Sequence, residues 1–99
     1  MRISDETRQT IVKTAQEIFG DNAEVLLFGS RVDDHARGGD IDLLVRSSKV
    51  IPERERKMLA LVARLQRRLG DQPIDVLVFD PQTKPMPIHE EALATGLRL

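Results

Sequence analysis

Two short apolar runs separated by a polar loop place the strongest constraint on the fold of this chain. The runs lie in residues 26–45, LLFGSRVDDHARGGDIDLLV, and the second run carries aspartates at alternate positions, Asp40 and Asp42. Residues i and i+2 of a strand share a face, so both carboxylates project from one side while Ile41 and Leu43 point to the other. A buried strand with two adjacent carboxylates needs a partner that offsets their charge.

Helical and strand patterns alternate along the rest of the chain. Ser4 is a suitable N-cap, and apolar residues recur at helical spacing up to Gly20, which predicts a first helix over Asp5–Phe19. The other expected elements are strands over residues 24–28, 40–45 and 73–80, and helices over 52–69 and Pro87–Thr95. This α-β-β-α-β-α order predicts an α/β (α+β) fold, a small β-sheet flanked by helices in a single domain over residues 1–99.

The composition excludes several classes of protein. The 15 basic and 16 acidic side chains nearly cancel, so no direct binding to nucleic acid is expected. Because the chain has no cysteine, disulfides and thiolate metal sites are excluded. No apolar run approaches the roughly 20 residues needed to cross a bilayer. We therefore expect a soluble cytoplasmic protein that does not associate with membranes.

A third carboxylate interrupts a later apolar strand, because Asp75 lies within PIDVLVF. If this strand neighbours the strand of Asp40 and Asp42, three carboxylates converge on one site. Oxygen ligands of this kind suit Mg²⁺ or Mn²⁺, and such a triad can hold two ions about 4 Å apart around a phosphoryl group in transfer. Asp75 would also be placed to accept the proton of an attacking hydroxyl.

A glycine and a serine directly follow the first strand. Gly29 allows the backbone to approach a ligand closely, and Ser30 can open a helical turn whose N–H groups and hydroxyl face a phosphate. Arg31 or Arg37 could then neutralise phosphate charge, and the sequence leaves open which of the two does so.

Together these segments, GSRVDDHARGGDIDLLV followed by PIDVLVFD, resemble the minimal nucleotidyltransferase (MNT) domains of the DNA polymerase β-like superfamily. The resemblance implies a mixed sheet with helices on one side, and a Mg²⁺-dependent transfer of a nucleoside monophosphate from an NTP with release of pyrophosphate. By match of position, it implies that Gly29 and Ser30 bind the triphosphate. It likewise implies that Asp40 and Asp42 bind the metals, and that Asp75 binds the catalytic metal and the acceptor hydroxyl.

Stand-alone domains of this size resemble those encoded beside small helical HEPN proteins, with which they form toxin–antitoxin pairs. The resemblance therefore implies transfer of AMP from ATP to a hydroxyl of a HEPN-type toxin partner, with a partner tyrosine as the acceptor in some members. Two alternatives stay open: a non-catalytic antitoxin that neutralises its partner by contact, and a sugar-nucleotide transferase with a metal-binding D-x-D. We expect the C-terminal segment ALATGLRL to pack on its own core, with a docking surface as the alternative.

Overall fold

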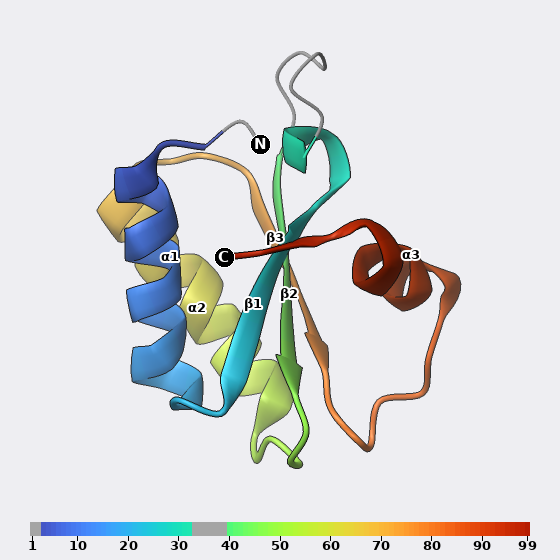
Figure 1. The fold of residues 1–99 in the computed structure, drawn as a ribbon. Coiled ribbons are helices and arrows are strands. Elements are labelled where there is room, and N and C mark those ends of the chain that lie inside the picture. The colour runs from blue at the N-terminus through green and yellow to red at the C-terminus, as the bar shows by residue number, and fades with distance from the viewer. Residues whose placement is uncertain (1–2, 33–39) are drawn as a thin grey trace.

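The computed structural model describes residues 3–32 and 40–99, and for Ser30 the backbone alone. Its elements in chain order are α1 (Asp5–Phe19), β1 (Ala23–Phe28), the 3₁₀ turn η1 (Gly29–Val32), β2 (Ile41–Ser47), α2 (Arg54–Leu69), β3 (Ile74–Phe79), α3 (Pro87–Thr95) and β4 (Leu97–Arg98) (Figure 1). The predicted order of helices and strands is confirmed, and β4 is an addition to it.

Within the described residues, the strands form one sheet in the order β3-β2-β1-β4. β1 runs antiparallel to both β2 and β4, whereas β2 and β3 are parallel. The parallel pair is joined through α2, as a parallel connection requires a crossover. The sheet is therefore mixed, as the resemblance implied.

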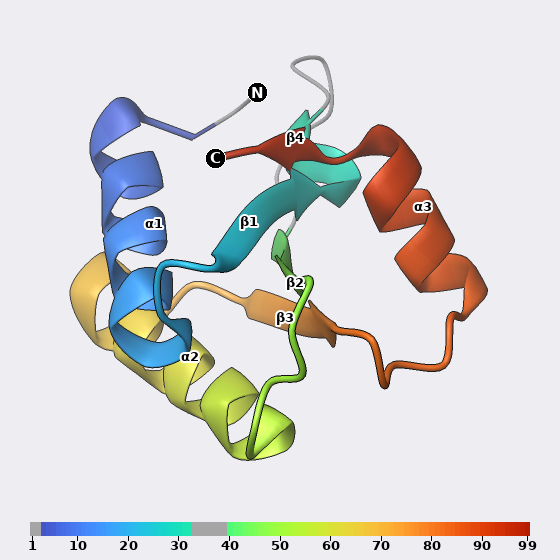
Figure 2. The same ribbon diagram turned by 60° about the horizontal axis from the view of Figure 1, so that its bottom comes forward.

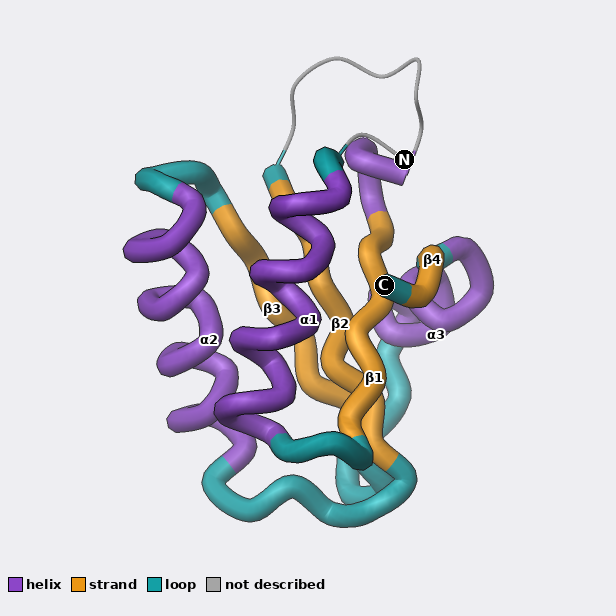
Figure 3. The backbone as a smooth tube through the Cα atoms, turned by 60° about the vertical axis from the view of Figure 1, so that its left-hand side comes forward, coloured by secondary structure: helices purple, strands orange, loops and turns teal. Residues whose placement is uncertain are grey.

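The helices cover both faces of this sheet, so the expectation of helices on one side is wrong. α1 and α2 lie side by side against one face (Figure 3), and α3 lies across the other (Figure 2). The larger core, between the sheet and the α1–α2 layer, includes Ile11, Ala15, Val25, Leu27, Ile41, Leu43, Val45, Leu61 and Leu65. A second apolar cluster of Leu26, Phe28, Leu44 and Ala92 lies on the opposite face. α3 covers this second apolar cluster, because exposure of the cluster to water would cost free energy.

Local signals account for the boundaries of α1. The Ser4 side chain accepts a hydrogen bond of 3.0 Å from the Thr7 N–H. At the other end the Gly20 N–H binds the Gln16 carbonyl, and Gly20 has a φ of +86°, which glycine adopts without strain. In residues 3–32 and 40–99 no helix is both long and apolar enough to span a membrane.

Other boundaries differ from the prediction because tertiary contacts set them. β2 begins after Asp40 and continues to Ser47, since Ser47 pairs with Ala23 and Arg46 forms an ion pair with Glu24 of β1. α2 begins at Arg54, two residues after the predicted start, because Asp80 holds the preceding loop and the first residue of the helix. The two-residue strand β4 carries no period that a sequence pattern could reveal.

Candidate active site

The parallel pairing of β2 and β3 brings two of the predicted carboxylates together. Asp42 and Asp75 are register partners across the two strands, and Phe28 of β1 pairs with Asp42 on its other side. Ile41 and Leu43 are buried in the α1–α2 core, so Asp42 projects from the opposite face, which α3 partly covers. The predicted convergence of Asp42 and Asp75 therefore rests on the strand register.

The surroundings of Asp42 disfavour its negative charge. Asp42 is partly buried, and Asp75 is exposed. Burial raises the pKa of Asp42, and the neighbouring charges of Asp75 and Asp40 raise it further. A bound cation would relieve both effects, since an opposite charge nearby favours the ionised carboxylate.

Asp40 is exposed and lies outside the strand, directly before β2. Among the residues that the structure describes, no three His, Asp or Glu side chains are grouped closely enough to hold a metal ion. Mg²⁺ is commonly held by one or two carboxylates together with water and substrate phosphates. The oxygen-only pair of Asp42 and Asp75, with the raised pKa of Asp42, therefore fits a divalent cation of this kind.

The turn η1 begins at Gly29, directly beside the carboxylate pair. Gly29 has a φ of +77°, and a Cβ at this position would collide with the Oδ2 atom of Asp42. Only glycine allows the backbone to lie this close to the carboxylate. Ser30 and Arg31 follow within η1, and Arg31 is partly buried. Arg37 lies outside the described residues, so its predicted role stays a prediction.

Replacement of Gly29 by alanine is expected to displace the Asp42 carboxylate and to weaken the binding of any ligand that the carboxylate pair holds. The matched control is Gly70→Ala, because Gly70 has a φ of +91° but no atom within 4 Å of an added Cβ. Gly70→Ala should cost only the backbone strain, about 1 kcal/mol. Gly29→Ala should cost at least about 1 kcal/mol more, because of the steric overlap. Thermal melting and ATP titration of both variants measure the difference, and equal behaviour would show that Gly29 does not serve the site.

A hollow of about 450 Å³ lies over the carboxylate pair. Its lining consists of Phe28, Gly29, Asp42, Asp75, Val76 and Leu77 from the sheet side, and Ile88 and Glu91 from α3. The sequence predicted α3 but gave no sign of which face of the sheet it covers, so Ile88 and Glu91 were not among the expected site residues. A second hollow, about 470 Å³, lies around Arg46 and Phe79 at the other end of these strands. We assign the site to the first hollow because it contains the paired carboxylates.

The mixed sheet and the carboxylates at one end of β2 and β3 define a nucleotidyltransferase-type domain. In agreement, residues 6–99 match the family described as polymerase beta, nucleotidyltransferase. The chain therefore belongs to this family, and the resemblance to the DNA polymerase β-like nucleotidyltransferase superfamily is confirmed.

Two solved structures are similar to this chain. A crystal structure of a mutant of the toxin–antitoxin pair MntA–HpeT superposes with a TM-score of 0.65 and 19% identity, over 91% of this chain and 69% of that chain. A candidate nucleotidyltransferase superposes with a TM-score of 0.50 and 25% identity, over 76% of this chain and 80% of that chain. The first similarity shows the fold alone. A search of curated proteins finds no match.

Proposed function

We propose that the chain is a Mg²⁺-dependent nucleotidyltransferase that moves AMP from ATP to a hydroxyl of a protein partner. The observation that carries this proposal is the register pairing of Asp42 with Asp75 beside Gly29. Two carboxylates and a close backbone approach in one hollow suit a metal-bound triphosphate. Membership of the nucleotidyltransferase family supports the reaction class.

In this proposal each residue has a separate role. Gly29 and Ser30 hold the triphosphate at the start of η1. Asp42 and Asp75 hold the metal as a pair, and Asp40, which directly precedes β2, joins them when the metal binds. Mg²⁺, when bound there, would supply positive charge that offsets the phosphates and the charge developing on the leaving pyrophosphate. The acceptor oxygen forms its bond to the α-phosphorus as the bond to pyrophosphate breaks, and Asp75 accepts the hydroxyl proton.

Additional positive charge is proposed to come from an arginine. Arg31 lies within η1, close in sequence to the proposed phosphate contacts. Arg37, which precedes β2 in the sequence, is the other candidate. A planar guanidinium suits two phosphate oxygens at once.

We further propose that the partner is a HEPN-type toxin and that the chain acts as its antitoxin. Support comes from the structural similarity to the MntA–HpeT toxin–antitoxin pair. The mutant in that structure carries two Asp-to-Glu replacements two positions apart, and Asp40 and Asp42 have the same spacing.

Incubation of the chain with α-labelled ATP, Mg²⁺ and the product of the adjacent gene tests the proposal. Label is expected on the partner with the unaltered chain and not with the Asp40→Ala, Asp42→Ala double variant. Absence of label from the partner, with a folded chain that binds Mg²⁺ and ATP, would refute transfer to it. If the double variant still neutralised the partner in cells, contact alone would explain the antitoxin role.

A further inference from the structure

Two residues of α3 complete the hollow over the carboxylates. Ile88 and Glu91 are three positions apart, so they lie on one side of the helix, and both line the hollow with Asp42 and Asp75. Ala92 is fully buried in the second apolar cluster, and Leu93 packs against that cluster. This packing holds α3 against the sheet, so the positions of Ile88 and Glu91 relative to the carboxylates are set by the fold.

The start of α3 also exposes apolar side chains, those of its N-cap residue Met86 and of Ile88, which lines the hollow. The exposed fraction is 56% for Met86 and 48% for Ile88. Neither side chain is needed to close a core, since the α3 contribution to the second cluster comes from Ala92 and Leu93. Exposed apolar side chains bordered by polar groups, next to a reactive site, are typical of a surface that contacts another molecule.

The charge of Glu91 is not used by the proposed metal site. Glu91 is exposed and lines the hollow from α3, whereas the proposed metal ligands belong to β2, to β3 and to the residue before β2. Bound metal would offset only part of the combined negative charge of the triphosphate and the three aspartates. Glu91 therefore adds negative charge to the α3 side of the hollow, and this favours a positively charged acceptor.

We propose that Met86, Ile88 and Glu91 form an acceptor wall that selects a hydroxyl carried by a basic protein segment. Ile88 and Met86 pack against the side chain that bears the hydroxyl, and Glu91 pairs with a lysine or arginine next to it. This inference rests on the proposed function and adds to it the chemical class of the acceptor. α3 thereby determines specificity and takes no part in the bond exchange itself.

Random copolymers of lysine with tyrosine and of glutamate with tyrosine are suitable probes of this wall. With α-labelled ATP and Mg²⁺, the unaltered chain is expected to label the lysine copolymer with a kcat/KM at least tenfold higher than the glutamate copolymer. Glu91→Lys should reduce this preference at least fivefold by raising KM for the lysine copolymer. The readout is the ratio of the kcat/KM values for the two copolymers, because any effect of the charge change on ATP binding is common to both acceptors.

The apolar contact that Ile88 makes in the acceptor wall is tested by a separate variant. Ile88→Ser is expected to raise KM at least threefold for both copolymers, because the tyrosine ring loses its apolar contact. Ile88→Val should restore most of the difference. A loss of kcat without a change in KM would contradict a role in acceptor binding.

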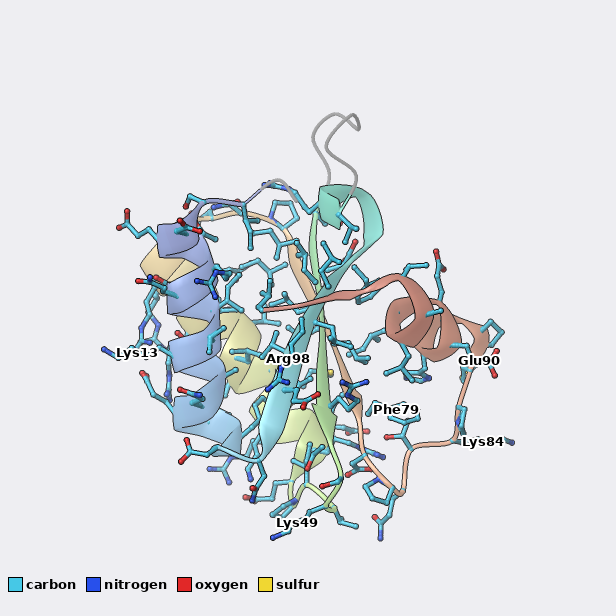
Figure 4. All side chains as sticks on the ribbon, viewed as in Figure 1. Lys13, Lys49, Phe79, Lys84, Glu90 and Arg98 are labelled. Atoms are coloured by element: carbon cyan, nitrogen blue, oxygen red, sulfur yellow. The ribbon has the colours of Figure 1, made fainter. Side chains whose placement is uncertain are left out.

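Glu90→Lys is the matched control for Glu91→Lys. This variant makes the same change of charge one position earlier in α3. The Glu90 side chain is exposed and points away from the sheet (Figure 4). General attraction between an acidic protein surface and polylysine would be weakened equally by both variants. The inference requires that Glu90→Lys change the preference by less than twofold.

The possible failures can be distinguished by calorimetric titration of the unaltered chain with ATP and Mg²⁺. If ATP binds but neither copolymer is labelled, or both are labelled equally, the inference is wrong while nucleotide binding stands. Equal effects of Glu90→Lys and Glu91→Lys would also overturn it. If ATP does not bind in the presence of Mg²⁺, the proposed function fails, and the inference fails with it.

Discussion

Replacement of Asp42 by asparagine is expected to abolish nucleotidyl transfer and, in the absence of metal, to raise the melting temperature. Transfer should fall by a factor on the order of 10³, because charge stabilisation by a bound metal contributes several kcal/mol at the transition state and each 1.4 kcal/mol is tenfold in rate. A carboxylate that lowers the stability of the metal-free fold is expected at a site that binds a cation, because the cation offsets the charge that the fold alone does not.

The gain in stability follows from the raised pKa of Asp42. Burial, Asp75 and Asp40 hold this pKa above its ordinary value of 3.8 in the folded chain. Stability is therefore lost as pH rises from the unfolded-state pKa through the folded-state pKa. Asparagine has nearly the same shape without the charge. The variant should therefore melt at a higher temperature than the unaltered chain once Asp42 is ionised, and the difference should disappear at a pH below the unfolded-state pKa.

Calorimetric melting of both proteins, with and without Mg²⁺ and ATP, measures this effect. Ligand should raise the melting temperature of the unaltered chain and leave that of Asp42→Asn unchanged, because only binding to the folded state stabilises it. Asp71→Asn, an exposed aspartate in the turn after α2, is the control for loss of a surface charge. If Asp42→Asn melted below the unaltered chain without metal, Asp42 would instead have a stabilising partner.

A second large effect is expected at Asp80, whose replacement by alanine should lower the melting temperature by about 10–25 °C, or about 3 kcal/mol. Asp80 is only 2% exposed. Its carboxylate accepts hydrogen bonds from the amides of Ile51 and Gln82, each 2.9 Å long, and from the Thr83 hydroxyl at 3.2 Å. It also pairs with Arg54 at 2.9 Å. Alanine would remove the acceptor of the Ile51 and Gln82 amides, and the bond from Ile51 is buried.

These bonds link the loop before α2, the first residue of α2 and the segment that follows β3. α2 begins without a side-chain cap, and its N-cap residue Glu53 has a φ of +52°. Asp80 replaces that cap by holding the loop before α2 and the first residue of the helix to the end of β3. Arg54→Gln should cost far less than Asp80→Ala, because Arg54 is partly solvated. Asp71→Ala is the control here, and it should change the melting temperature little.

The Asp80 contribution should also depend on pH. Burial by itself would raise the pKa of Asp80. The amides of Ile51 and Gln82, the Thr83 hydroxyl and the Arg54 charge together outweigh that effect, so that the pKa falls below 3.8. The stabilisation is present above the unfolded-state pKa and is lost as pH falls through the folded-state pKa. The melting difference between the unaltered chain and Asp80→Asn should therefore be constant from about pH 7 to 5 and shrink below about pH 4; a constant difference at low pH would contradict this.

Local signals predicted the elements whose ends depend on neighbouring residues. α1 and α3 have the predicted bounds, Asp5–Phe19 and Pro87–Thr95, because a cap, a proline or a glycine acts within a few residues of itself. β4 and the last residues of β2 escaped prediction because they are strands through pairing, β4 with β1 and the end of β2 with β1 and β3. The importance of Asp80 was missed as well, although the run DPQT suits an aspartate turn.

Successive side chains of a strand point to opposite faces of the sheet. The sequence by itself therefore determined that Asp42 lies on the face opposite to Ile41 and Leu43, and that Asp75 lies on the face opposite to its own neighbours in β3. Only the tertiary structure decided that the two strands are neighbours in a register that pairs these carboxylates. It alone also placed Ile88 and Glu91 of α3 over them. The reason is physical: side-chain direction along a strand is a local property of the backbone, whereas strand order and the face that a helix covers depend on how the whole chain buries its apolar surface.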